Sequence, residues 1–102
     1  MSAPGAKDDF PVGCEVWVPA FGWWRRARVV GHKRLTIVLE ITYRNGRRTW
    51  TRRTTRDPRD RLVHGGITYQ WLYRTDVVSD IRTEPIFALY GRPVAKRIEG
   101  LA

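Results

Sequence analysis

The sequence predicts a mainly β fold: a small five-stranded barrel followed by a short, partly helical C-terminal extension. Three observations predict it. Apolar and polar residues alternate in short segments, which is the period of strands. Glycine-containing turns separate these segments. The chain has 102 residues, 42% of them hydrophobic, which suits one domain. We expect a flexible leader over residues 1–12, the barrel over 13–74, and an extension over 75–102 that packs on the barrel or on a partner.

The first two strands are expected over residues 13–18 and 23–30. In the first, Cys14, Val16 and Val18 alternate with Glu15 and Trp17, and Pro19 ends the strand or places it at an edge. In the second strand, one face looks like core and the other like surface. The core face carries Trp23, Arg25, Ala27 and Val29, and the surface face carries Trp24, Arg26, Arg28 and Val30.

The third and fourth strands are expected to form a hairpin. Residues 35–43 alternate strictly, and Asn45-Gly46 is typical of a type I′ turn. That turn sets Ile41 opposite Trp50, so Trp50 belongs to the core face rather than to a stacking surface. Arg48 and Arg52 then lie at the margin of the core. A bulged or three-residue turn would invert these faces. The outer face carries Arg44, Arg47 and Arg53.

The remainder reads as a long loop, a fifth strand and short helical segments. Residues 55–66 contain Asp57-Pro58 and Gly65-Gly66, which favour a loop. Residues 67–73 alternate, with large side chains on one face, and form the fifth strand. Residues 75–81 and 85–90 are each expected to form a short helical segment.

The positive charge is concentrated in one part of the chain. The formal net charge is +9, and residues 23–61 hold 13 basic and three acidic residues, a balance of +10. A cluster of this kind is typical of a protein that binds a polyanion. The alternative is a solvated face whose arginines reflect a GC-rich genome, because arginines far outnumber lysines.

Other classes of function find little support in the sequence. No apolar stretch approaches the roughly 20 residues of a membrane span, and residues 1–11 do not resemble a signal peptide. A single cysteine, Cys14, favours a reducing, cytoplasmic compartment. Cys14, His32 and His64 lack the spacing of metal ligands. We therefore expect no enzyme activity, no metal and no cofactor.

Three sequence segments together resemble small SH3-like barrels, with Tudor and KOW domains nearest in style. The segments are Gly13-x-x-Val16-x-Val18, the run 22–29 (GWWRRARV), and Ile37-x-Leu39-x-Ile41-x-Tyr43-x-Asn45-Gly46. The resemblance covers about residues 13–73. A Tudor-like reader would bind a methylated Lys or Arg in an aromatic cage, whereas KOW-like barrels are basic and bind nucleic acid. The positive charge of this chain favours the KOW-like, nucleic-acid-binding type over the Tudor-like type. The rings available to a cage would be Trp17, Phe21, Trp23, Trp24 and Tyr43.

These observations predict a protein that binds the nucleic-acid backbone with little sequence specificity. Arginines on neighbouring strands can contact successive phosphates, and DNA is favoured over RNA. An accessory, nucleoid-associated protein or a phage or mobile-element factor fits. Trp24, beside Arg26 and Arg28, can stack on an unpaired base; the alternative is that it is core. The candidate contacts are Arg25, Arg26, Arg28, Arg44, Arg47, Arg53, Arg56 and Trp24.

A second hypothesis comes from the apolar run near the C-terminus. Residues 86–90 (IFALY) are conspicuously apolar for a tail. They would form a docking surface, centred on Ile86, Phe87 and Tyr90, in a structural or adaptor protein such as a phage virion component or a host-targeting inhibitor. The arginine face would then contact an acidic protein partner.

Overall fold

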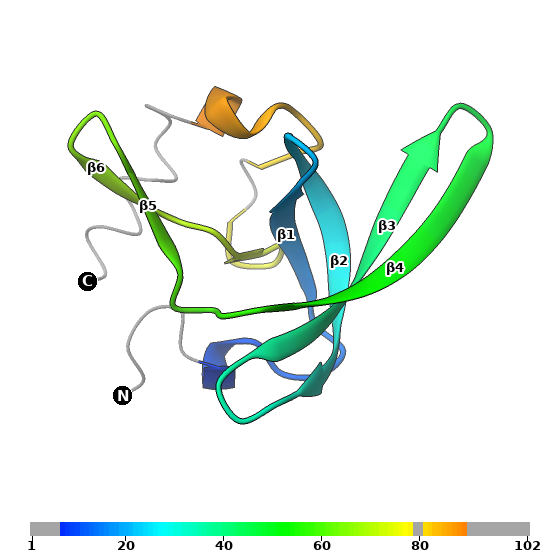
Figure 1. Ribbon diagram of the computed structural model, residues 1–102, viewed down its shortest axis with the longest axis horizontal. Coiled ribbons are helices and arrows are strands. Elements are labelled where there is room, and N and C mark those ends of the chain that lie inside the picture. Colours follow the sequence, from blue (N-terminus) through cyan, green and yellow to red (C-terminus); the bar gives the residue numbers. More distant parts are fainter. Residues whose placement is uncertain (1–6, 79–80, 90–102) are drawn as a thin grey trace.

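The computed structural model describes residues 7–78 and 81–89, and its main feature is an antiparallel five-stranded sheet (Figure 1). The strand order is β4-β3-β2-β1-β7, so the last strand returns beside the first. A separate two-stranded hairpin, β5-β6, lies to one side. The strands are β1 (Glu15–Ala20), β2 (Trp23–His32), β3 (Ile37–Asn45), β4 (Arg48–Arg56), β5 (Arg61–His64), β6 (Ile67–Gln70) and β7 (Tyr73–Arg74).

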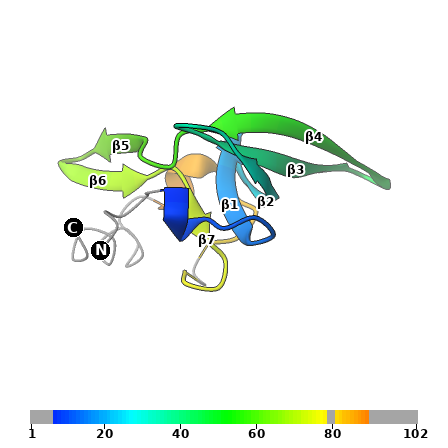
Figure 2. The same ribbon diagram turned by 90° about the horizontal axis from the view of Figure 1, so that it is seen from below.

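The mainly β prediction is confirmed, but the sheet is not closed into a barrel. The edge strands β4 and β7 do not pair with each other. The β3–β4 hairpin instead extends away from the rest of the chain in both views (Figures 1 and 2). The arrangement is compatible with a small barrel-like fold that is open on one side.

The sheet has a hydrophobic cluster on each face, because neighbouring residues of β1 and β2 point in opposite directions. On the first face the side chains of Val16, Val18, Ala27 and Val29 pack with Ile37, Leu39, Ile41 and Tyr43 of β3. These are the residues that alternation assigned to the core. The second cluster consists of Trp17, Trp24, Tyr69, Tyr73, Val78 and Ile81.

The second cluster corrects the prediction that the Trp24 face is surface. The Trp24 side chain is only 1% exposed, whereas Trp23, assigned to the core, is 44% exposed. The reason is that the C-terminal segment covers the second face. Pro85 forms a β-bridge to Trp23, and the amide of Trp24 donates a hydrogen bond to the carbonyl of Glu84 at 2.8 Å. The described part of the extension, residues 75–78 and 81–89, therefore packs on the sheet, and its 3-10 helix η2 spans Ile86–Leu89.

The β3–β4 register differs from the predicted one by two residues. Tyr43, rather than Ile41, lies opposite Trp50, and Asn45 pairs with Arg48. The turn therefore consists of Gly46 and Arg47. Only Gly46 has a positive φ, 61°, which matches a type II′ turn with glycine first rather than the predicted type I′ turn. A shift of two leaves the strand residues on their predicted faces. Arg47, predicted to lie on the outer face of a strand, lies in the turn instead.

The segments outside the central strands correct three further predictions. Residues 55–66 are not one long loop, because β4 continues to Arg56 and Gly65-Gly66 turns the β5–β6 hairpin. The expected fifth strand is divided into β6 and β7. The leader is not wholly loose: after the 3-10 helix η1 (Lys7–Asp9), Phe10 is 2% exposed, and its carbonyl is hydrogen-bonded to the His32 ring.

Candidate functional site

The outer part of the β3–β4 hairpin lies beyond the hydrophobic core. Every residue from 44 to 52 is exposed, and we call this segment the hairpin arm. The core on this side ends at Tyr43, which is 7% exposed, while its cross-strand neighbour Trp50 is 40% exposed. The prediction that Trp50 is core is therefore wrong, although its face was predicted correctly. Trp50 lies on the same face as the core side chains Ile41 and Tyr43, but beyond the end of the core, where its indole is partly exposed.

The hairpin arm carries four arginines that form no ion pair with any residue the structure describes: Arg44, Arg47, Arg48 and Arg52. Elsewhere, several arginines do have carboxylate partners. Arg26 lies 3.3 Å from Glu15, and Arg59 lies 3.0 Å from Asp57. The arm is thus a place where positive charge is not neutralised locally.

The arginines that were predicted to bind nucleic acid lie at several different places on the sheet and the hairpin arm. Arg44 and Arg47 lie on the arm. Arg53, at the base of the arm, lies 3.4 Å from Glu40. Arg26 and Arg28 lie on the same face of the sheet as Arg44 and Arg53, because Arg28 pairs with Glu40 and Glu40 pairs with Arg53. The Arg26 guanidinium lies 5.7 Å from the centre of the Trp17 ring. Arg25 and Arg56 lie on the other face, with Tyr43 and Ile37, so the predicted set is divided between the two faces of the sheet.

Arg25 and Arg56 take part in local contacts. The Arg25 Nε donates to the Ala20 carbonyl at 2.9 Å, and its guanidinium lies 4.9 Å from the centre of the Tyr43 ring. Arg56 donates to Thr54 and to the carbonyl of Thr55. Sequence reasoning left Arg48 and Arg52 out of the candidate set because it placed them at the margin of the core. The sequence did contain a signal: Arg48, Trp50 and Arg52 are alternate residues of one strand, so the two arginines lie on the same face as the tryptophan.

A row of three aromatic rings runs across the base of the arm. Phe21, in the β1–β2 turn, lies 5.8 Å from Tyr43 between ring centres, tilted by 56°. Tyr43 in turn lies 5.7 Å from Trp50, with the planes only 16° apart. With Arg25 and Arg52, these rings line an open hollow of about 340 Å³, which we call the aromatic groove.

Trp24, predicted to stack on a base, is not available for that role. Its ring packs edge-on against Tyr73 at 5.6 Å, and its Nε1 donates to the carbonyl of Ile86 at 3.1 Å. With 1% of the side chain exposed, no ring face remains for a ligand. The role requires an exposed ring, and Phe21 (78% exposed) and Trp50 satisfy that requirement.

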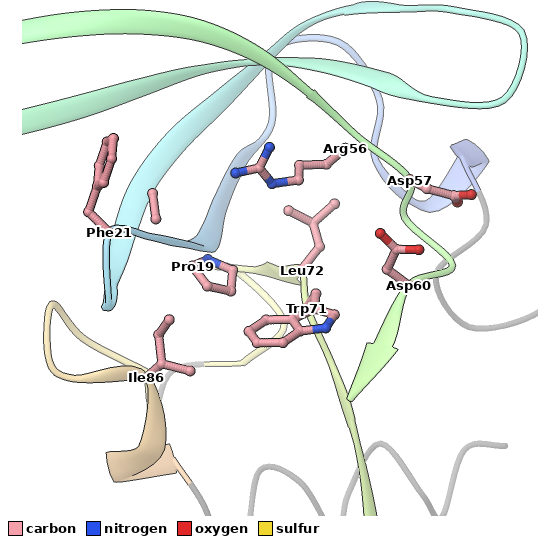
Figure 3. A pocket seen from close by; sticks show the side chains of 9 residues that line it. Pro19, Phe21, Arg56, Asp57, Asp60, Trp71, Leu72 and Ile86 are labelled. Atoms are coloured by element: carbon pink, nitrogen blue, oxygen red, sulfur yellow. The ribbon is translucent and has the colours of Figure 1, made fainter. Parts of the chain in front are cut away.

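A second hollow, of about 330 Å³, lies between the β1–β2 turn and the segment after β6 (Figure 3). Pro19, Trp71, Leu72 and Ile86 form an apolar wall, opposite Arg56 and two aspartates. Hydrogen bonds from Arg59 lower the pKa of Asp57. Ile86, predicted to dock a partner, lies at this hollow; Phe87 is 69% exposed. Tyr90 lies outside the described residues.

Metal binding, membrane insertion and thiol chemistry are three other roles that a small protein can have. Within residues 7–78 and 81–89 no group of three His, Cys, Asp or Glu side chains is placed to hold a metal ion. Among those residues there is also no helix of the length and apolarity needed to cross a membrane. Cys14 is partly buried, and burial raises the pKa of its thiol, which disfavours the reactive thiolate form.

The sequence matches no protein-family model, and comparison with curated proteins and with solved structures finds no significant match.

Proposed function

We propose that this protein binds nucleic acid through the hairpin arm, chiefly by contacts to phosphates and with little sequence specificity. The observation that carries the proposal is the set of four arm arginines without carboxylate partners among the described residues. Codon bias would raise the number of arginines anywhere on the surface. It does not account for an arginine-rich arm whose cations have no described carboxylate within ion-pair reach.

The shape of the arm supports the same proposal. The arm extends beyond the core as a two-stranded ribbon (Figure 1), so its cations can reach a nucleic-acid backbone without obstruction by the rest of the described structure. Arginine guanidinium groups bind phosphate oxygens bidentately, and contacts of this kind fix position without reading sequence. Arg47 in the turn and Arg44 and Arg48 beside it place three cations at the end of the ribbon.

Charge reversal on the arm tests the proposal. The variant Arg44→Glu/Arg47→Glu/Arg48→Glu is compared with Lys33→Glu/Arg34→Glu/Arg82→Glu, a control that makes the same change in charge at exposed positions away from the arm. Binding is measured by fluorescence anisotropy on labelled duplex DNA across a salt series. Each lost phosphate contact lowers the slope of log K against log salt by about 0.9. The arm variant should therefore lose about 2–3 units of slope, and the control should lose less than about one.

Two results would contradict the proposal. If both triple variants weaken binding equally, only the bulk charge matters and the arm has no special part. If the wild-type protein binds no nucleic acid even at low salt, the arm has another partner. Circular dichroism establishes that both variants are folded.

A second candidate function, docking on an acidic protein, is favoured by one observation. Phe87 is 69% exposed beside the hollow lined by Ile86 and Trp71, and exposed rings of this kind are common at interfaces. In that case Phe87→Ser should reduce partner binding, measured by isothermal titration calorimetry against an isolated partner, and leave nucleic-acid binding unchanged.

A further inference from the structure

The aromatic groove offers a flat ring with one face covered and the other unoccupied. Trp50 stacks on Tyr43 at 5.7 Å and is held nearly parallel to it. No other aromatic pair or cation–π contact involving Trp50 is present among the described residues. The side chain is 40% exposed, so its outer face is open to a ligand.

Cations flank this ring on the same face of the hairpin. Arg48 and Arg52 lie two residues before and after Trp50 on β4, and alternation places all three side chains on one face. At about 3.3 Å per residue, the two arginine positions are about 13 Å apart with the indole midway. From strand β2, the Arg25 guanidinium lies over the Tyr43 ring. The described residues that line the groove include no carboxylate.

The ligand that suits this arrangement is planar, apolar on its faces and negatively charged at both ends. A nucleobase with its flanking phosphates has these properties, since the base stacks on the ring and the phosphates meet the arginines. A methylated lysine or arginine does not suit it, because the cation would be placed beside Arg25 and Arg52 with no acid in the groove lining to offset the repulsion.

We propose that the aromatic groove binds an unpaired nucleobase on Trp50, and that the protein therefore prefers single-stranded to duplex nucleic acid. This inference rests on the proposed nucleic-acid binding and specifies its substrate class. In a duplex each base is stacked on its neighbours, so reaching Trp50 requires unpairing, which carries an energetic cost. In a single strand the base is free to stack.

The test separates base stacking from phosphate binding by using two oligonucleotides of equal length. One is oligothymidylate, and the other is an abasic strand that keeps the phosphates but has no bases. Anisotropy should show that wild-type protein binds oligothymidylate about 5- to 150-fold more tightly, the range expected for one stacked base. Trp50→Ala should remove this difference and leave the affinity for the abasic strand unchanged. Trp23→Ala is the matched control, because its indole is 44% exposed but does not line the groove.

A second measurement does not depend on how Trp50→Ala folds. Oligothymidylate should quench part of the tryptophan fluorescence of the wild-type protein, and the abasic strand should quench less. In Trp50→Phe, which retains an aromatic ring against Tyr43, this extra quenching should be absent while binding persists.

The outcomes distinguish the two proposals. Equal affinity for the abasic strand and for oligothymidylate would overturn the base site but leave phosphate binding by the arm intact. Equal weakening of both strands by Trp50→Ala would also overturn it, since the indole would then only support the shape of the arm. Absence of binding to duplex, oligothymidylate and abasic strand alike would overturn both proposals.

Discussion

Replacing Trp24 by phenylalanine should destabilise the protein without weakening nucleic-acid binding. The indole is 1% exposed, packs against Tyr73, and donates through Nε1 to the carbonyl of Ile86, 62 residues away in the chain. Phenylalanine keeps a six-membered ring but has no N–H. The lost hydrogen bond contributes about 1 kcal/mol, and the space left by the smaller ring costs about 1 kcal/mol more. We therefore expect a loss of about 2 kcal/mol in the free energy of unfolding.

The assay is urea unfolding followed by far-UV circular dichroism. A loss of about 2 kcal/mol corresponds to a fall in Tm of about 8–16 °C for a domain of this size. Trp23→Phe is the control: its indole is 44% exposed, so we expect a change within about 0.5 kcal/mol. Under conditions where Trp24→Phe is folded, its affinity for oligothymidylate should equal that of the wild type.

The opposite pattern would refute the reasoning. If Trp24→Phe kept full stability and lost affinity, Trp24 would contact the ligand directly. The second hydrophobic cluster, and the packing of the C-terminal segment over it, would then be wrongly assigned.

Three further predictions concern Tyr73, Gly46 and Cys14. Burial raises the pKa of Tyr73 to about 12, above the value near 10 in an unfolded chain. The folded state holds the phenolic proton of Tyr73 more tightly than the unfolded state does. The free energy of unfolding is therefore retained below about pH 10 and falls by about 2–3 kcal/mol between about pH 10 and 12. Urea unfolding of Tyr73→Phe should show a smaller fall over the same pH range. Gly46 has a φ of 61°, and a side chain added there would meet no other atom within 4 Å. Gly46→Val should therefore cost about 1–2 kcal/mol through backbone strain alone, and Gly46→Asn less, by the same urea assay. Because burial raises the Cys14 pKa, iodoacetamide at about pH 8 should alkylate the folded protein more slowly than the protein in urea; equal rates would show that the thiol is open.

Alternation predicted the first core well because one face of β1, β2 and β3 is buried along most of its length. Val16, Val29, Leu39 and Ile41 are at most 1% exposed, as a two-residue period with one apolar face requires. No distant contact was needed for this prediction, since each of these strands pairs with its neighbour in the sequence.

The second cluster was missed because alternation assigns the other face to solvent by default. Trp24 was assigned to the surface face beside Arg26 and Arg28, and Trp17 was placed on the face opposite Val16 and Val18. They are buried by residues distant in the sequence, among them Val78, Ile81 and Ile86. Two tryptophans on the same face of adjacent strands were the available signal that something covers that face.

The position of Trp50 depends on a quantity that alternation does not contain, namely how far each strand extends past the core. The predicted and observed registers differ by two residues, which preserves the face but moves Trp50 from beside Ile41 to beside Tyr43. Ile41 is 1% exposed and Tyr43 is 7% exposed, so that step crosses the edge of the core. In the predicted register, Arg48, Trp50 and Arg52 would lie at the margin of the core, with the arginine side chains reaching out to solvent. In the observed register the same three residues form an exposed surface with an indole between two cations. The choice of Gly46-Arg47 over Asn45-Gly46 for the turn therefore exposes the groove on which the base-binding proposal depends.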